Sequence, residues 1–149
     1  MAIKVFVART DAEMASCLAL RRTVFIEEQN VPEEIEMDGE EGRCIHVLAT
    51  VDGKPVGAAR FYYGQDDRGG TYAKLQRVCV LKEHRGTGVG ADLIRFMVNK
   101  VDRDKRTHRV VLGAQVYALD FYRKLGFVEF GDEYLDADIV HKDMERLLA

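Results

Sequence analysis

The sequence predicts an α/β domain built on a mixed, mostly antiparallel sheet with helices on both faces. Three consecutive strand patterns, residues 45–51, 55–63 and 71–80, are joined by short turns, which is typical of an antiparallel meander. A strand, a glycine-rich turn, an amphipathic helix and a further strand then occupy residues 78–113, which predicts one parallel crossover. The chain has 149 residues, the length of one domain, and we take residues 1–149 as that domain.

Composition excludes several classes of protein. Hydrophobic residues make up 47% of the chain and charged residues 32%, near the norm for globular proteins, which excludes a disordered or fibrous chain. The net charge of −3 leaves no basic excess, so we expect no nucleic-acid partner. No apolar run approaches ~20 residues, so we expect no membrane partner. The N-terminus lacks the pattern of a secretory signal, and we expect a cytoplasmic location.

Cysteine and histidine usage argues against a metal centre. Cys17, Cys44 and Cys79 lie far apart in apolar stretches, without a C-x-x-C pair. No two of the four histidines stand at metal-ligand spacing. We therefore expect reduced, structural thiols and no bound metal.

The first elements are a strand and a capped helix. Residues 2–8 have the pattern of a strand, and Thr10 with Glu13 forms a capping box at the start of the helix. Apolar residues at helical spacing extend this helix to about Glu28.

An acidic segment follows at residues 27–41, with eight acidic residues and no basic one. Pro32 and Gly39 favour a loop with one helical turn. Two interpretations stay open. The segment is either a solvated acidic loop or an acidic wall that attracts a cationic substrate.

Turn residues delimit the remaining elements. Asp52-Gly53 predicts a tight hairpin turn, and a glycine-rich cluster at residues 64–70 predicts a second turn. A helix with one apolar face follows Gly90, and the almost wholly apolar residues 109–113 predict a short strand buried on both faces. The final elements are a helix at 118–125 closed by Gly126 and strands at 127–130 and about 139–145.

The turn before the amphipathic helix predicts a phosphate-binding site. Free backbone amides and the positive end of the helix dipole attract an anion there, and glycine lets the backbone approach it closely. Arg85 adds a formal charge beside the turn. The alternative is a tight turn whose glycines serve shape alone. The residues of the turn are Arg85, Gly86, Thr87, Gly88, Val89 and Gly90.

Neighbouring residues exclude one familiar phosphate-binding motif and argue against another. A mononucleotide P-loop needs Lys and Ser or Thr after the glycines, and here Ala91-Asp92 follows Gly90. The spacing Gly86-x-Gly88-x-x-Ala91 does fit the dinucleotide pattern. That pattern also needs an acid at the end of the next strand, and residues 109–113 contain none.

Together, these motifs resemble the GNAT acyltransferase superfamily. The resemblance rests on Val78-Cys79-Val80, the 85–90 turn and residues 121–127 (Phe-Tyr-Arg-Lys-Leu-Gly-Phe), and its motifs cover residues 71–130. Residues 24–29, Asp38-Gly39, Ala114-Gln115 and residues 138–141 further resemble the bacterial ElaA/YjcF-like branch, whose members are mostly of unassigned substrate. The resemblance implies a sheet splayed open between its fourth and fifth strands.

The resemblance also implies acetyl-coenzyme A as co-substrate. Its pyrophosphate would lie on the amides of the glycine turn, and its pantetheine arm would pair with the backbone of the 78–80 segment like an extra strand. A backbone N–H in that segment would polarise the thioester carbonyl. The implied contacts are Val78, Cys79, Val80, Arg85, Gly86, Thr87, Gly88, Val89, Gly90, Ala91 and Gln115.

Two catalytic roles are expected. Tyr122 stands where the superfamily places a tyrosine that protonates the leaving thiolate; the alternative is a core aromatic. Some members carry a glutamate base at a position that is Lys74 here. We therefore expect Glu28 as the base, provided that burial raises its pKa, with His84 or His141 acting through water as alternatives.

The function expected is N-acetyl transfer from acetyl-coenzyme A to a primary amine of a small molecule or peptide. Direct attack is favoured because no cysteine stands beside a base. Alternatives are a non-catalytic acyl-coenzyme A-binding module, or a transferase with another acyl donor or a hydroxyl acceptor. The oligomeric state stays open, a homodimer included.

Overall fold

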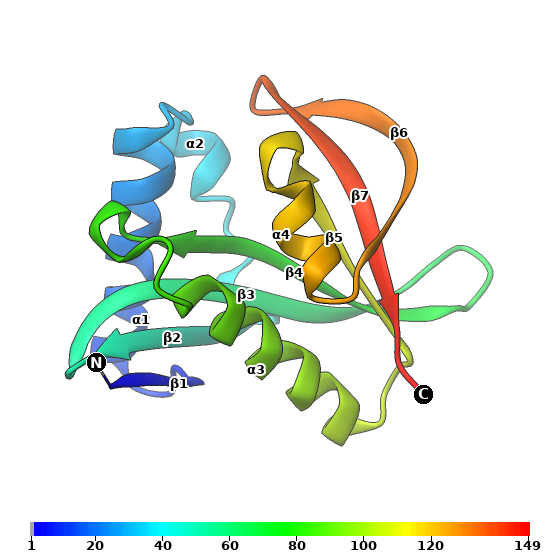
Figure 1. Ribbon diagram of the computed structural model, residues 1–149, viewed down its shortest axis with the longest axis horizontal. Coiled ribbons are helices and arrows are strands. Elements are labelled where there is room, and N and C mark those ends of the chain that lie inside the picture. Colours follow the sequence, from blue (N-terminus) through cyan, green and yellow to red (C-terminus); the bar gives the residue numbers. More distant parts are fainter. Residues whose placement is uncertain (1) are drawn as a thin grey trace.

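The computed structural model describes residues 2–149, whose seven strands form one sheet in the order β1-β2-β3-β4-β5-β7-β6 (Figure 1). Within these residues β4 and β5 pair in parallel, and the other neighbouring strands pair antiparallel, which confirms the predicted mixed sheet. The strands are β1 (Ile3–Val7), β2 (Ile45–Val51), β3 (Lys54–Gln65), β4 (Thr71–Val80), β5 (Arg109–Gln115), β6 (Val128–Asp136) and β7 (Ile139–Leu147). The α-helices are α1 (Asp11–Arg21), α2 (Glu33–Glu36), α3 (Val89–Asp104) and α4 (Leu119–Lys124).

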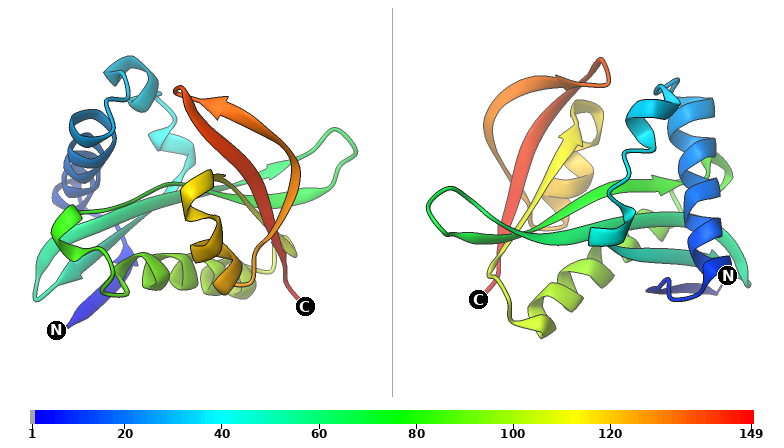
Figure 2. Two further views of the ribbon diagram at one scale, coloured as in Figure 1. Left: turned by 45° about the horizontal axis from the view of Figure 1, so that its top comes forward. Right: turned by 180° about the vertical axis from the view of Figure 1, so that it is seen from behind.

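Helices cover both faces of the sheet, as predicted (Figure 2). The larger core lies under α3, where Leu93 and Met97 pack against alternate sheet residues such as Val47 and Phe61. The smaller core lies under α1. Strand residues point alternately to opposite faces, so β2 supplies Val47 to one core and Leu48 to the other. The part of the chain that the structure describes contains no helix long and apolar enough to span a membrane.

The sheet parts between β4 and β5. Their pairing is limited to Ala73–Leu75 against Val110–Leu112, and beyond it each strand continues alone toward Val80 and Gln115. The two halves of the sheet diverge from this point in the left view of Figure 2. This is the splay expected between the fourth and fifth strands.

A β-bulge lies just beyond that point. Two residues of β4, Arg77 and Val78, oppose one residue of β3, Ala59. Arg77 takes a left-handed backbone conformation with φ of 55°, which is uncommon outside glycine, Asn and Asp. The bulge therefore stands where β4 loses its partner β5.

Local turn chemistry was predicted correctly. Thr10 Oγ1 accepts from the Glu13 amide at 3.1 Å, and Glu13 Oε1 accepts from the Thr10 amide at 3.1 Å, completing the capping box. Asp52 and Gly53 both have positive φ, as the tight hairpin requires. The three cysteines are free, and Cys17 and Cys79 are buried.

Three element predictions need correction. The first helix is α-helical only to Arg21 and continues as a π-helical segment, Arg22–Glu28. Strand β5 buries only alternate side chains fully, those of Val110, Leu112 and Ala114, because one of its faces packs in the larger core and the other is only partly covered. Strands β6 and β7 are longer than predicted, since their polar residues extend a hairpin with one exposed face.

Candidate active site

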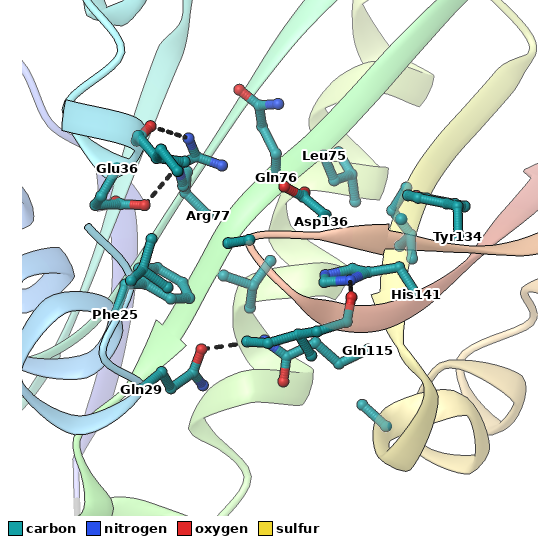
Figure 3. A pocket seen from close by; sticks show the side chains of 18 of the residues that line it. Phe25, Gln29, Glu36, Leu75, Gln76, Arg77, Gln115, Tyr134, Asp136 and His141 are labelled. Carbon is teal, nitrogen blue, oxygen red and sulfur yellow. Dashed lines mark hydrogen bonds and ion pairs between the residues drawn. The ribbon is translucent and has the colours of Figure 1, made fainter. Parts of the chain in front are cut away.

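A cavity of about 200 Å³ lies where β4 and β5 part (Figure 3). The π-helical segment and α2 form one wall, and the β6–β7 hairpin with the start of α4 forms the other. Side chains that line it include Phe25, Gln29, Arg77, Gln115, Tyr122, Tyr134 and His141.

The glycine turn lies at the start of α3, beside the end of β4. Gly86 and Gly88 have φ of 78° and 97°, and no atom lies within 4 Å of where a Cβ would stand on either. No amide from Gly86 to Ala91 has a hydrogen-bond acceptor among residues 2–149, as expected at a helix start. Thr87 Oγ1 donates to the His84 carbonyl at 2.6 Å and closes the turn. The exposed first half of the turn, residues 86–88, therefore presents free donors with open space beside its glycines, whereas Val89 is buried.

Arg85 binds another predicted site residue, Glu28. Its Nη1 and Nη2 donate to the two carboxylate oxygens at 2.5 and 2.7 Å, and its Nε donates to the Val80 carbonyl at 3.0 Å. The hydrogen bonds from Arg85 lower the pKa of Glu28 below its ordinary value. The expected rise of this pKa through burial is therefore wrong. The carboxylate also lies outside the set of residues that line the cavity.

The segment predicted to pair with the coenzyme has one free edge. β4 bonds to β3 on one side, while its other side loses β5 after Leu75. Backbone groups on an unpaired edge are available to an added strand-like ligand. Across the gap, Gln115 at the end of β5 donates from Nε2 to Gln29 Oε1 at 3.1 Å. Cys79 points away from the gap into the core under α1.

Tyr122 packs among aromatic residues and also faces the cavity. Its ring makes edge-to-face contacts with Phe121 and Phe127, at centroid distances of 5.0 and 6.1 Å. The same residue lines the cavity. Burial raises the pKa of its phenol, so the hydroxyl carries its proton at neutral pH.

His141 lies on the same wall of the cavity as Tyr122, on β7 (Figure 3). Its Nδ1 is 2.7 Å from the Ile139 carbonyl, which can only accept, so Nδ1 carries the proton of the neutral ring and Nε2 is left as an acceptor. The ring stacks on Tyr134, whose hydroxyl donates to Asp143 Oδ1 at 2.7 Å. His84, the other histidine considered as a base, does not line this cavity.

Comparison with known proteins places the chain in a family. The family model for the acetyltransferase (GNAT) domain matches residues 7–148. This chain belongs to the GNAT acetyltransferase family. The uncharacterised N-acetyltransferase YjcF of Bacillus subtilis is 36% identical over 143 residues, covering 95% of this chain and 98% of YjcF.

Solved structures share the fold of this GNAT domain. Escherichia coli ElaA has a TM-score of 0.84 and 27% identity, over 97% of this chain and 99% of ElaA. An aminoglycoside 6'-N-acetyltransferase complexed with coenzyme A has a TM-score of 0.72, over 99% of this chain and 97% of that one; its 17% identity shows the fold alone. The predicted resemblance to the ElaA/YjcF-like branch is confirmed.

In the acidic segment of this GNAT domain, some carboxylates are exposed to solvent and others form ion pairs with buried arginines. Glu36 is 2% exposed and binds Arg21 Nε at 2.7 Å and Arg77 Nε at 2.9 Å. Asp38 binds Arg60 Nη2 at 2.6 Å, and Arg60 is 1% exposed. Sequence reasoning missed these pairs. A signal was present, because an arginine amid the apolar residues of a central strand needs a buried acidic partner.

Proposed function

We propose that this protein transfers an acetyl group from acetyl-coenzyme A to a primary amine by direct attack. One observation carries the proposal: a turn of unbonded amides opens α3 next to the unpaired edge of β4. An anion bound at the turn and an extended arm bound along the edge would bring a thioester to Tyr122. The coenzyme A complex of the aminoglycoside 6'-N-acetyltransferase supports this donor class for the fold.

The donor would occupy three parts of the chain. Its pyrophosphate accepts hydrogen bonds from the amides of Gly86, Gly88, Val89 and Gly90, with Thr87 and Ala91 beside them. Its pantetheine arm pairs with the backbone of Val78–Val80 and reaches toward Gln115. A backbone amide of that segment donates to the thioester oxygen and stabilises the negative charge that develops there.

Tyr122 and His141, on one wall of the cavity, would carry the proton transfers. One proton of the substrate ammonium first passes through water to Nε2 of His141, which leaves a neutral amine. The amine nitrogen attacks the carbonyl carbon, the carbon–sulfur bond breaks, and the Tyr122 hydroxyl gives its proton to the leaving thiolate; the tyrosinate then takes the second proton from the nitrogen of the product. His141 replaces Glu28 as the proposed base because its acceptor nitrogen has no partner among residues 2–149, whereas the carboxylate of Glu28 is bound by Arg85.

Direct attack fits the state of the cysteines. An acyl-enzyme would need a thiolate beside the thioester. Burial raises the pKa of Cys17 to about 11 and that of Cys79 to about 12, so both stay protonated at neutral pH. Neither sulfur lines the cavity.

Calorimetry with acetyl-coenzyme A, followed by a panel of amines assayed for release of the coenzyme A thiol, tests the proposal. We expect donor binding without an acceptor, and thiol release only with certain amines. The variant His141→Gln should then lose the acidic limb of the pH–rate profile. Absence of donor binding would exclude the donor site. Binding without thiol release for any amine would favour the non-catalytic module.

A further inference from the structure

The bulge on β4 holds a large side chain in a backbone conformation that favours glycine. Arg77 has φ of 55° and stands two residues beyond Leu75, the last residue of β4 paired with β5. Bulges with a left-handed first residue usually have glycine there, because a Cβ crowds the neighbouring backbone. The chain uses arginine instead, so its side chain must stabilise what its backbone disfavours.

Two residues of the acidic segment form ion pairs with this side chain. Arg77 Nε lies 2.9 Å from Glu36 Oε2, and Arg77 Nη2 lies 3.2 Å from Asp38 Oδ2 (Figure 3 shows the Glu36 contact). The guanidinium is four-fifths buried, and the Glu36 side chain is 3% exposed. We call Glu36, Asp38 and Arg77 the bulge clamp.

Two further arginines hold the acidic residues of the clamp in place. Arg21 of α1 binds Glu36, and Arg60 of β3 binds Asp38 through two nitrogens, at 3.2 and 2.6 Å. Both of these arginines are almost fully buried. Because each carboxylate already pairs with two arginines, Glu36 and Asp38 are poor candidates for attracting a cationic substrate. Their position instead ties α2 to the point where the sheet opens.

We infer that the bulge clamp orients the Val78 amide toward the acyl carbonyl, so that Glu36, Asp38 and Arg77 act as positioning residues for acyl transfer. This inference rests on the proposed function, since the amide of Val78 matters only if a thioester lies along β4. A bulge re-aims the groups beside it, and Val78 is the second residue of this bulge. Releasing the clamp would rotate that amide and leave the glycine turn, beyond Val80, in place.

Replacing Arg77 by alanine and by glycine separates the effect of its backbone conformation from the effect of its side chain. Arg77→Ala removes the clamp but keeps a Cβ, so the left-handed conformation is lost. Arg77→Gly also removes the clamp, yet glycine adopts that conformation unaided. We expect Arg77→Ala to lower kcat by about 100-fold with donor KM nearly unchanged, and Arg77→Gly to recover most of that loss.

A spectroscopic measurement needs no acceptor. Acetyl-coenzyme A labelled with carbon-13 at its carbonyl should show an infrared band shifted to lower frequency when bound to the wild-type protein. The shift should vanish in Arg77→Ala and return in Arg77→Gly. Glu36→Gln should weaken it when Arg77 is present and should have little further effect in the Arg77→Gly background. Asp38→Asn serves as the second clamp variant if Glu36→Gln does not fold.

The outcomes separate this inference from the proposed function. A wild-type protein that does not bind acetyl-coenzyme A overturns the proposed function. A wild-type protein that shows the shifted band while Arg77→Ala keeps it overturns the clamp alone. A folded Arg77→Gly no better than Arg77→Ala also overturns the clamp, because backbone conformation would then not be what Arg77 supplies.

Discussion

Two segments at the end of β4 solve the same backbone problem in different ways. The glycine turn reaches positive φ at Gly86 and Gly88 by having no Cβ. The bulge has positive φ at Arg77, whose side chain forms ion pairs with the buried Glu36 and the partly exposed Asp38. The glycines of the turn are exposed, whereas side chains pack over the bulge. A left-handed turn made of glycines leaves its backbone amides accessible and so suits anion binding. A left-handed residue whose side chain is ion-paired suits a position where the backbone of a strand must stay fixed.

The two segments also depend on the rest of the chain to different degrees. The glycine turn is built from consecutive residues and closes on itself through Thr87 and His84. The bulge clamp draws on α1, α2, β3 and β4. Substitutions in the first should act locally on donor binding, and substitutions in the second should act on stability as well as on rate.

Gly88→Asp gives the largest expected effect, because it disrupts the glycine turn itself. Its Cβ would force strain at φ of 97°, and its carboxylate would stand where we place the pyrophosphate. We expect acetyl-coenzyme A affinity to fall by about 100-fold or more, measured by calorimetry. Gly88→Ala carries the strain without the charge and should lose less. A folded Gly88→Asp with wild-type affinity would show that the turn serves shape alone.

Tyr122→Phe tests whether the Tyr122 hydroxyl, in the cavity wall formed by α4 and the β6–β7 hairpin, takes part in the reaction. The substitution keeps the contacts with Phe121 and Phe127 and removes the hydroxyl. If Tyr122 protonates the thiolate, kcat should fall by about 100-fold with donor KM little changed. Tyr117→Phe is the matched control, since Tyr117 also lines the cavity but is 80% exposed. An equal loss in both variants, or in neither, would reduce Tyr122 to packing.

Asp38→Asn tests how much the charge pairing in the bulge clamp stabilises the fold, through the pH dependence of the free energy of unfolding. Burial alone would raise the pKa of Asp38, but hydrogen bonds from Arg60 and the Glu40 amide, with the charges of Arg60 and Arg77, outweigh it and hold the pKa at about 2. A pKa depressed in the folded state stabilises the protein above the unfolded value and ceases to do so as pH falls through the folded one. The carboxylate therefore contributes at most about 2 kcal/mol at neutral pH, less the part that solvent screens, because Asp38 is an exposed residue.

We expect Asp38→Asn to lose about this amount of unfolding free energy at pH 7, measured with denaturant, and to converge with the wild type between about pH 4 and pH 2. Glu34→Gln, at an exposed position of the same segment, should change stability little at any pH. A difference that persists unchanged at pH 2 would mean that the substitution costs packing rather than charge pairing.

The same contrast explains what was predictable from the sequence. The capping box at Thr10, the hairpin at Asp52-Gly53 and the glycine turn were all predicted, because each rests on chemistry within a few residues. The splay came from resemblance to a family. The clamp was missed because Arg77 lies 39 residues from Asp38 and 41 residues from Glu36 along the chain, and nothing local to Arg77 signals a positive φ. The π-helical segment was missed because its apolar spacing also fits an α-helix.

Glu28→Gln has the smallest expected effect and probes the ion pair between Glu28, in the π-helical segment, and Arg85, in the glycine turn. Glu28 and Arg85 are exposed, so their attraction is screened by solvent and salt. Removing the carboxylate leaves the charge of Arg85 free beside the turn. We therefore expect acetyl-coenzyme A to bind about two- to fivefold more tightly at low salt, with the gain lost at high salt. Glu27→Gln, at the exposed neighbouring acid, is the control.

The same variant decides the identity of the base. Arg85 lowers the pKa of Glu28, so the carboxylate is ionised throughout the range in which an amine acetyltransferase is assayed. It then contributes no acidic limb to the pH–rate profile, and Glu28→Gln should leave that limb in place. If the limb disappears in Glu28→Gln and persists in His141→Gln, donor binding must first draw Arg85 away from Glu28 and release its carboxylate as the base. Persistence in both variants would assign the limb to the amine itself, which attacks only in its neutral form.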